Sequence, residues 1–339
     1  MRRLTPKRTS LHFLDGDRQL KHCEELTRNL SDSISRHRTD SILFSGGLDS
    51  AIIASLTRPE YAVTVGLGQE AEDILYSRQV AQKFCRRHVI CVLDIAGIVG
   101  LIEKVIHFLK TFDPIAVRNS VVALAGLEQA KADGYSEVMT GDGGDELFAG
   151  YNYLSRYYGD HERLKAELLR LWQIMHFSTN DLAAAISMQV ASPFLDPLFV
   201  SFAKSLPTED KVGSRDGRQW GKFILRTCFE SELGHIAWRE KAAQEIGSGT
   251  WQISEYMKQS IHDSDWNQSV SAAAKEGVEL RDKEHSYYYG IYRKYHSVPG
   301  QENANCYDRC PKCSGRFAGP NTKYCRICGA FPVLPVQSL

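Results

Sequence analysis

Two glycine-rich segments combine a freely turning backbone with carboxylate and hydroxyl side chains. Residues 44–50 read Phe-Ser-Gly-Gly-Leu-Asp-Ser, and residues 140–151 read Thr-Gly-Asp-Gly-Gly-Asp-Glu-Leu-Phe-Ala-Gly-Tyr. Each segment follows a short apolar run that predicts a strand. Backbone N–H groups between a strand and a helix bind phosphate, and nearby carboxylates bind Mg²⁺. The two segments therefore indicate a site for a phosphate chain and a divalent cation.

The first segment offers phosphate donors and one metal ligand. Ser45, Gly46, Gly47 and Ser50 supply hydroxyls and close backbone approach, and Asp49 supplies a hard oxygen ligand for Mg²⁺. A simple tight turn is the alternative, because glycine pairs often follow strands for that reason alone. The segment does not end in Gly-Lys-Ser/Thr, so it is not a Walker loop.

The second segment places three carboxylates between four glycines. Asp142, Asp145 and Glu146 lie so close together that they repel one another unless cations offset their charge. A solvated acidic turn is the alternative, but the glycines on both sides of Asp142 favour close approach to a ligand. We expect Asp49 and Asp145 to meet at the same edge of one sheet, as two Mg²⁺ ligands.

The elements that position these segments alternate along the chain. Strands are expected at 41–44, 62–67, 88–93 and 137–140. Helices are expected at 17–37, 49–57, 71–87, 98–110 and 117–132. This alternation is typical of an α/β fold with a doubly wound parallel sheet, in which ligands bind at the carboxyl ends of the strands. Residues 160–260 are expected to be mainly helical, with no further strand.

Several segments together resemble one known family. Residues 45–50 resemble the SGGxDS loop of the N-type ATP pyrophosphatases, also called PP-loop proteins, and residues 141–151 resemble the GDGGDELF-GY segment of their asparagine synthetase branch. The other matching segments are 65–67, 113–118, 192–196, 222–226, 239–244 and 247–249. The resemblance covers about residues 17–250. It implies a sheet similar to that of the adenine-nucleotide alpha-hydrolases.

The family's pattern implies which residues contact ATP. They are Phe44, Ser45, Gly46, Gly47, Asp49, Ser50, Val65, Gly141, Asp145 and Lys241. Asp49 and Asp145 would ligate Mg²⁺, and Lys241 would neutralise charge that builds on the departing pyrophosphate. Asp142 occupies the family's acyl-acceptor position, where it would orient the acid or accept a proton from an amine.

Two further residues are implied to contact the acid substrate. Arg118 is suited to pair with a substrate carboxylate, and Glu146 lies beside the second metal ligand in the sequence. A structural role for Arg118 is the alternative, because an arginine of this kind often serves only the fold.

The resemblance implies an ATP-dependent amide ligase that adenylates a carboxylate and passes it to ammonia or an amine, releasing AMP and pyrophosphate. Residue 2 is arginine, where full asparagine synthetases carry a nucleophilic cysteine, so we expect no glutaminase domain and allow for a separate glutaminase subunit. The acid is either aspartate or a related small acid, or belongs to a macromolecule such as tRNA, a peptide or a carrier protein. A non-catalytic ATP-binding subunit is a third reading, against which the intact Asp49, Asp142, Asp145 and Lys241 argue.

Four of the nine cysteines form two Cys-x-x-Cys pairs. The pairs are Cys310 with Cys313 and Cys325 with Cys328, and this spacing predicts one tetrahedral, structural Zn²⁺. Disulfides are the alternative. The unit resembles a zinc ribbon, which would serve to dock a partner or a macromolecular substrate. Four other cysteines are expected to behave as small apolar residues, namely Cys23, Cys85, Cys91 and Cys228.

Composition limits the remaining classes. Lysine plus arginine equals aspartate plus glutamate at 41 each, so no overall positive field attracts nucleic acid or membranes. No apolar run approaches the roughly 18 residues of a membrane span, and no signal peptide is evident, so a cytoplasmic location is expected. A homo-oligomer is left open. The expected organisation is a tail and helix at 1–37, an ATP pyrophosphatase core at 38–160, a helical part at 161–296, a linker at 297–309 and a zinc ribbon at 310–339.

Overall fold

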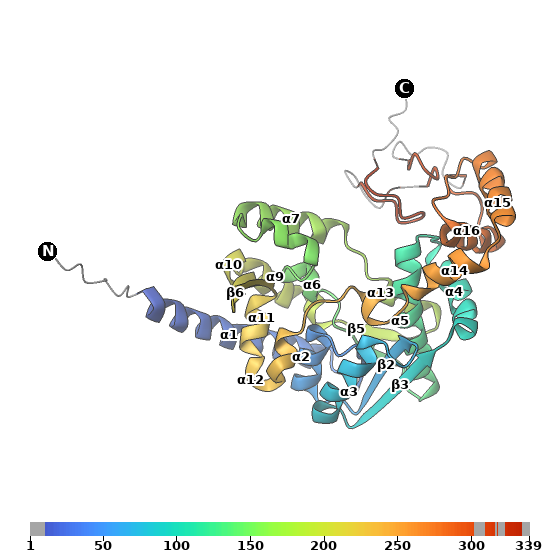
Figure 1. Cartoon of the computed structure of the whole chain (residues 1–339). Helices are drawn as coiled ribbons and strands as arrows, with labels where there is room; N and C mark the ends of the chain where they lie inside the picture. Colours follow the sequence, from blue (N-terminus) through green and yellow to red (C-terminus); the bar gives the residue numbers. More distant parts are fainter. Residues whose placement is uncertain (1–10, 302–308, 316, 318–322, 334–339) are drawn as a thin grey trace.

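A computed structural model of the chain describes residues 11–301, 309–315, 317 and 323–333 (Figure 1). Its centre is a five-stranded parallel sheet in the order β3-β2-β1-β4-β5. The strands are β1 Ser41–Leu43, β2 Tyr61–Leu67, β3 Arg87–Leu93, β4 Glu137–Met139 and β5 Gln189–Ala191. The predicted α/β fold with a doubly wound parallel sheet is confirmed.

Successive strand residues point to opposite faces of the sheet and enter two different apolar cores. Tyr61, Val63 and Leu43 pack into the core that contains the helices α4 and α5, whereas Ala62 and Ile42 pack into the core that contains α1, α2 and α3. Both faces are therefore covered in the described part of the chain, so a ligand is expected at the strand ends.

The helices of the N-terminal half follow the predicted alternation. They are α1 Leu11–Arg36, α2 Leu48–Thr57, α3 Glu72–Phe84, α4 Ile95–Leu109 and α5 Pro114–Ala132. Local chemistry explains where two of them begin. Asp94 caps α4 by accepting from the Gly97 N–H at 2.7 Å, and Asp113 caps α5 directly before Pro114. Among the described residues, none of the helices combines the length and the apolar character needed to cross a bilayer.

The second half is mainly helical, as expected, but it also contains three strands that the sequence analysis missed. Its helices are α6 Gly144–Leu147, η1 Asn152–Tyr157, α7 His161–Ile174, α8 Ser178–Ala185, η2 Pro193–Leu195, α9 Pro197–Ser205, α10 Thr208–Lys211, α11 Phe223–Cys228, α12 Glu230–Leu233, η3 Gly234–Trp238, α13 Gln244–Gly247, α14 Gln252–Ser260, α15 Asp263–Lys275 and α16 Lys283–Tyr295. The missed strands are β5, which has three residues, and the hairpin of β6 Val212–Arg215 and β7 Arg218–Gly221.

The hairpin and the helices around it stand on one side of the strand ends, and the C-terminal helices stand on the other. In Figure 1, α7, α9, α10 and β6 lie together at the upper left, while α14, α15 and α16 lie beside α4 at the upper right. The pocket described below is lined by residues that follow β1 and β4, such as Ser45 and Asp142, and by Lys222, which follows the hairpin. This arrangement makes the ends of the central strands the floor of a pocket.

A disulfide between Cys23 and Cys228 joins α1 to α11. The expectation that both behave as small apolar residues is therefore wrong. The two cysteines are 205 positions apart, and only the packing of α1 against α11 brings them together. Cys85 and Cys91 are free and partly buried, and burial raises the pKa of the Cys85 thiol to about 12, so this thiol stays neutral as expected.

Candidate active site

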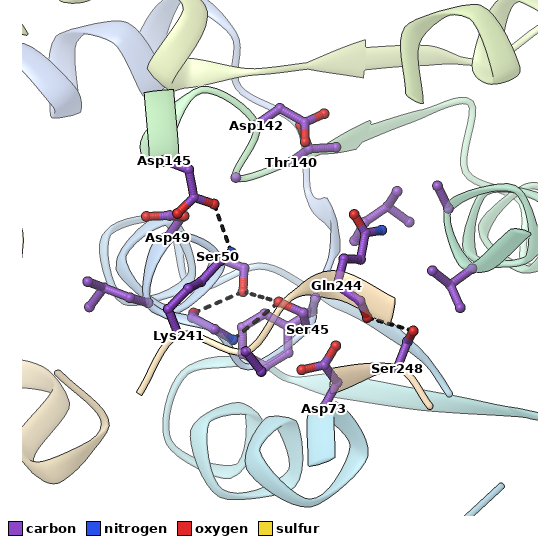
Figure 2. Close-up of a pocket in the computed structure, with 18 of the residues that line it drawn as sticks. Ser45, Asp49, Ser50, Asp73, Thr140, Asp142, Asp145, Lys241, Gln244 and Ser248 are labelled. Atoms are coloured by element: carbon purple, nitrogen blue, oxygen red, sulfur yellow. Dashed lines mark hydrogen bonds and ion pairs between the residues drawn. The ribbon is translucent and has the colours of Figure 1, made fainter. Parts of the chain in front are cut away.

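The first glycine segment forms a tight loop between β1 and α2. Gly46 has φ +68°, and a Cβ at this position would lie 2.5 Å from the backbone nitrogen of Ser77, so only glycine fits. The Ser50 hydroxyl donates to the Gly47 carbonyl at 3.1 Å, and the Gly47 N–H donates to the Ser45 hydroxyl at 3.2 Å. The loop is therefore shaped before any phosphate binds (Figure 2).

The second glycine segment follows β4, which pairs directly with β1 through Ile42 and Met139. A Cβ at Gly144 would lie 2.5 Å from the carboxylate carbon of Asp49, and one at Gly141 would lie 2.9 Å from the Asp49 Cβ. The glycines thus allow the two loops to touch. Asp49 and Asp145 meet at one edge of the sheet in the arrangement that the sequence predicts, although their metal-binding role stays a prediction.

A buried lysine, Lys222, bridges these two carboxylates. Its Nζ lies 2.5 Å from Asp49 Oδ2 and 2.7 Å from Asp145 Oδ1, and its side chain is only 3% exposed. Lys241 adds a second ammonium group, 2.8 Å from Asp145 Oδ2. The sequence analysis gave Lys222 no role, although it opens the matching segment 222–226, which was the available signal.

The backbone of Lys222 shows that its position is enforced. Its φ is +54°, a left-handed conformation that costs a non-glycine residue about 1 kcal/mol, and its N–H donates to the Phe148 carbonyl at 2.7 Å. The residue leaves β7 at Gly221, where a Cβ would lie close to the Ala149 carbonyl. The hairpin therefore delivers the ammonium group into the pocket from above the second loop.

Burial and the neighbouring charges shift the pKa of Asp49, Asp145 and Lys241. Burial raises the pKa of Asp49, because the attraction of Lys222 does not fully offset the lost hydration. Burial also acts to raise the pKa of Asp145, but the ammonium groups of Lys222 and Lys241 outweigh it and leave that pKa below its usual value. For Lys241, burial acts to lower the pKa, yet Asp145 and Asp49 raise it overall.

The carboxylate pair keeps unused ligand capacity. Oδ1 of Asp49 and Oδ1 of Asp145 are buried, and neither has an aligned hydrogen bond among the described residues. The Asp145 oxygen is close to Lys222 Nζ, so its contact is an ion pair rather than a directed bond. Buried oxygens of this kind fit a hard divalent cation such as Mg²⁺, which takes carboxylate oxygens as ligands.

Two arginines that the sequence analysis did not assign hold the pocket's rim. Arg239 donates to Asp73 at 3.2 Å and to the Gly46 carbonyl at 3.3 Å, which ties it to the first loop. Arg226 donates to the backbone carbonyls of Ala237 and Arg239 at 2.7 and 2.9 Å, so it fixes the segment that carries Lys241. Burial raises the pKa of Asp73 to about 6, although Arg239 opposes this.

The pocket contains nearly all the residues expected to bind ATP. The expected residues that line it are Phe44, Ser45, Gly47, Asp49, Ser50, Val65, Gly141, Asp145 and Lys241. Gly46 does not line the pocket but turns the loop. Next to the polar groups, Leu43, Val63 and Gly126 provide an apolar wall of the kind that an adenine ring requires.

The three expected substrate-binding residues are separated in the structure. Asp142 lines the pocket and accepts from the Thr140 hydroxyl at 3.1 Å, and burial raises its pKa. Glu146 does not line the pocket. It accepts from the Tyr151 hydroxyl at 2.5 Å, and burial together with Asp145 raises its pKa to about 7.

Arg118 also does not line the pocket, because it forms an ion pair with Glu284 at 2.9 Å. Glu284 is 2% exposed and also accepts from the Tyr288 hydroxyl at 2.9 Å. In the structure Arg118 thus forms an ion pair within the fold, and its contact with a substrate stays a prediction.

The four clustered cysteines form a second candidate site. The Sγ atoms of Cys310, Cys313, Cys325 and Cys328 all lie within 4.8 Å of one another. Two of the separations are 3.8 Å, between Cys310 and Cys328, and 3.6 Å, between Cys313 and Cys325. A tetrahedron with Zn–S distances of 2.3 Å has edges of about 3.8 Å. All four thiols are buried. The donor set fits Zn²⁺, and it would supply the folding free energy that so small a unit lacks.

The cysteine unit is packed against the core. The Phe112 N–H donates to the Ile327 carbonyl at 2.8 Å, the Tyr324 hydroxyl bonds Asp113, and Arg281 donates to the Gly329 carbonyl at 2.8 Å. The cysteines share an apolar cluster with α4, α5 and α16. Of the expected linker 297–309, residues 302–308 lie outside the described part. The contacts do not favour a unit that moves independently of the core.

Comparison with known proteins provides relatives for this arrangement. The family model described as asparagine synthase matches residues 25–171 and 159–287. Root asparagine synthetase (glutamine-hydrolysing) of Pisum sativum is 29% identical over 241 residues, which cover 64% of this chain and 41% of that protein. Asparagine synthetase B (glutamine-hydrolysing) of Escherichia coli K12 is 28% identical over 250 residues, covering 66% and 45%.

This chain thus spans less than half the length of those relatives. Among solved structures, a U34-tRNA thiolase from Methanococcus maripaludis, determined with its 4Fe-4S cluster, aligns over 88% of this chain and 85% of its own. The sequence identity is 12% and the TM-score is 0.30, values too low to support an inference about this pocket.

The bridging lysine gives a first prediction. Lys222→Met should lower the free energy of unfolding by about 3 kcal/mol, because it leaves buried Asp49 without its ammonium partner. Added Mg²⁺ should recover part of this loss by restoring positive charge between the carboxylates. Urea unfolding with and without Mg²⁺ measures both effects. Lys258→Met, at a side chain that is 75% exposed, is the control and should change neither. If Mg²⁺ does not reduce the loss of unfolding free energy in Lys222→Met, the result contradicts the metal site.

The cysteine unit gives a second prediction. Cys310→Ser should remove one Zn²⁺ per chain and increase amide hydrogen exchange in α5 and α16 as well as in the unit itself, because these elements share contacts. Metal analysis and hydrogen-exchange mass spectrometry test this, with α2 as the internal reference. Cys91→Ser, at a free thiol outside the unit, is the matched control. If the faster exchange stays within residues 309–333, the unit folds independently of the core.

Proposed function

We propose that this chain, which belongs to the asparagine synthase family, is an ATP-dependent ligase that adenylates a carboxylate and transfers the acyl group to ammonia or an amine. The supporting observation is the arrangement of Asp49, Lys222, Asp145 and Lys241 at the meeting point of two glycine loops. Four such charges beside a preformed glycine loop suit the departure of a highly charged group. AMP and pyrophosphate are the proposed by-products.

In this mechanism the chain mainly positions and stabilises charge. The loop of residues 45–50 would hold the phosphate chain, and Phe44 and Val65 would face the adenine ring. Asp49 and Asp145 would hold Mg²⁺, which supplies positive charge to the phosphates when bound. Lys222 keeps these two carboxylates together, so the metal ligands are placed in advance.

Lys241 and Asp142 would act on the reacting groups. As the acid's carboxylate oxygen forms its bond to the α-phosphorus, the bond to the pyrophosphate oxygen breaks, and Lys241 would stabilise the growing negative charge. The amine then attacks the acyl carbon, and AMP leaves. Asp142 would accept the amine's proton, a role that suits a buried carboxylate whose pKa is raised.

The nitrogen source and the acid are the finer parts of the proposal. The names of the relatives describe glutamine hydrolysis by those proteins. For this chain we propose free ammonia, an amine on another molecule, or ammonia from a separate glutaminase subunit. The acid is a small carboxylate, with a macromolecular acid docked near the cysteine unit as the alternative. The test is release of AMP and pyrophosphate from ATP and Mg²⁺ across a panel of carboxylates, with and without ammonia. Formation of ADP and phosphate would contradict it.

The metal ligands give a third prediction. Asp49→Asn and Asp145→Asn should each lower the rate of carboxylate-dependent pyrophosphate release more than 100-fold. Loss of one charged ligand beside the leaving group removes about 3 kcal/mol of transition-state stabilisation, which corresponds to such a factor. Asp263→Asn, whose side chain is 86% exposed, is the charge-matched control and should keep full activity. Pyrophosphate release near the wild-type rate in either site variant would contradict the assignment.

Lys241 gives a fourth prediction. Lys241→Ala should slow adenylation by about 100-fold while changing the Kd for ATP by only a few-fold, because its charge matters most when the pyrophosphate departs. Single-turnover kinetics measure the first quantity, and calorimetric titration with a non-hydrolysable ATP analogue measures the second. A collapse of ATP affinity with intact turnover would show that the lysine acts only in ground-state binding.

A further inference from the structure

The lysines and arginines that line the pocket all belong to its phosphate end. They are Lys222, Arg226, Arg239 and Lys241. Lys222 and Lys241 are paired with Asp49 and Asp145. Arg239 is tied to Asp73 and the first loop, and Arg226 is occupied by backbone carbonyls. Within the described part of the chain, none of these four cations forms a hydrogen bond or ion pair with Asp142.

The other polar end of the pocket contains hydroxyl groups and one carboxylate. Asp142 accepts a hydrogen bond from the Thr140 hydroxyl at 3.1 Å and another from the side chain of Thr179 in α8. The Ser192 hydroxyl lies 3.0 Å from the Thr140 hydroxyl. Figure 2 shows Asp142 and Thr140 on the side of the pocket away from Lys241 and Ser45. The nearby charges of Asp49 and Asp145 are also negative and act to raise the pKa of Asp142.

This end is where the non-reacting part of an acid would lie. If the phosphate chain follows residues 45–50 and the adenine ring lies against Phe44 and Val65, the acyl group on the α-phosphate faces the second loop. Asp142 lies on that loop, three residues before Asp145. Whatever the acid carries beyond its reacting carboxylate therefore meets a negative field and hydroxyl donors.

Arg118 cannot supply a positive charge beside Asp142 without destabilising the fold. It is paired with Glu284, whose side chain is 2% exposed, while that of Arg118 is 14% exposed. Withdrawing Arg118 would leave the buried Glu284 carboxylate with two neutral partners, the hydroxyls of Tyr288 and Ser254. An unpaired buried charge is strongly destabilising.

From this distribution of charge we infer that the pocket selects acids without a second free carboxylate, so that aspartate is not the substrate. The inference rests on the proposed adenylation site and narrows its substrate class to acids whose remainder is neutral or positively charged. Activated through its side chain, aspartate would bring its α-carboxylate next to Asp142 with no described cation to pair with it. Its α-ammonium group alone would be accommodated. Like charges without a counter-ion oppose binding.

Two matched adenylate mimics test this. The β-aspartyl and β-alanyl sulfamoyl adenosines are stable analogues of the acyl-adenylate, and they differ only in the α-carboxylate. Calorimetric titration of the full chain should give a Kd at least about tenfold lower for the β-alanyl compound. Equal or tighter binding of the β-aspartyl compound would overturn the inference and leave the ligase proposal standing. If neither compound binds, the adenylate site itself is misplaced, and the proposed function fails.

Two variants test whether the charge at this end of the pocket causes the selectivity. Thr179→Lys places an ammonium group beside Asp142, so it should lower the Kd of the β-aspartyl compound relative to that of the β-alanyl compound. Asp142→Asn keeps the shape of the side chain and removes its charge. It should therefore reduce the difference in Kd between the two compounds, even if the first variant does not fold. If neither variant changes the difference in Kd between the two compounds, the electrostatic explanation is overturned.

Discussion

The structure depends on keeping two largely buried carboxylates next to each other at the end of a sheet. Asp49 and Asp145 come from loops after neighbouring strands, and their mutual repulsion would open the pocket without a cation between them. Lys222 supplies that cation from a third part of the chain. The site is therefore folded around charges that also favour a metal ion and polyphosphate. Stability and proposed chemistry share the same interaction, so neither can be altered alone.

Backbone geometry rather than side-chain packing brings these groups together. Gly141 and Gly144 remove the atoms that would hold the two loops apart, and the hairpin turns Lys222 into a left-handed conformation that its neighbours stabilise. Arg226 and Arg239 then connect the segment around Lys241 to the first loop. Each charged group is held by a different element. This explains why the pocket needs both the sheet and the helical part of the chain.

The sequence predicts contacts that follow from the order of the strands, but not those that depend on distant partners. The meeting of Asp49 and Asp145 was predictable because parallel strands end at one edge. The bridge by Lys222 joins residues 173 positions apart, and the pairing of Arg118 with Glu284 spans 166 positions, so neither pattern is visible locally. The β6–β7 hairpin did have a local signal, Asp216-Gly217, a dipeptide typical of tight hairpin turns.

The bond between Cys23 and Cys228 closes residues 23–228 into a covalent ring. Asp49, Asp142, Asp145 and Lys222 are all members of this ring, whereas Lys241 and the four clustered cysteines are not. While the bond is intact, one peptide cleavage inside the ring leaves a single connected molecule. A cleavage between residues 228 and 241 instead separates Lys241 from the rest of the pocket. Lys241 is thus connected to the other charged groups by one covalent path, whereas those groups are connected to one another by two, one of which passes through the disulfide.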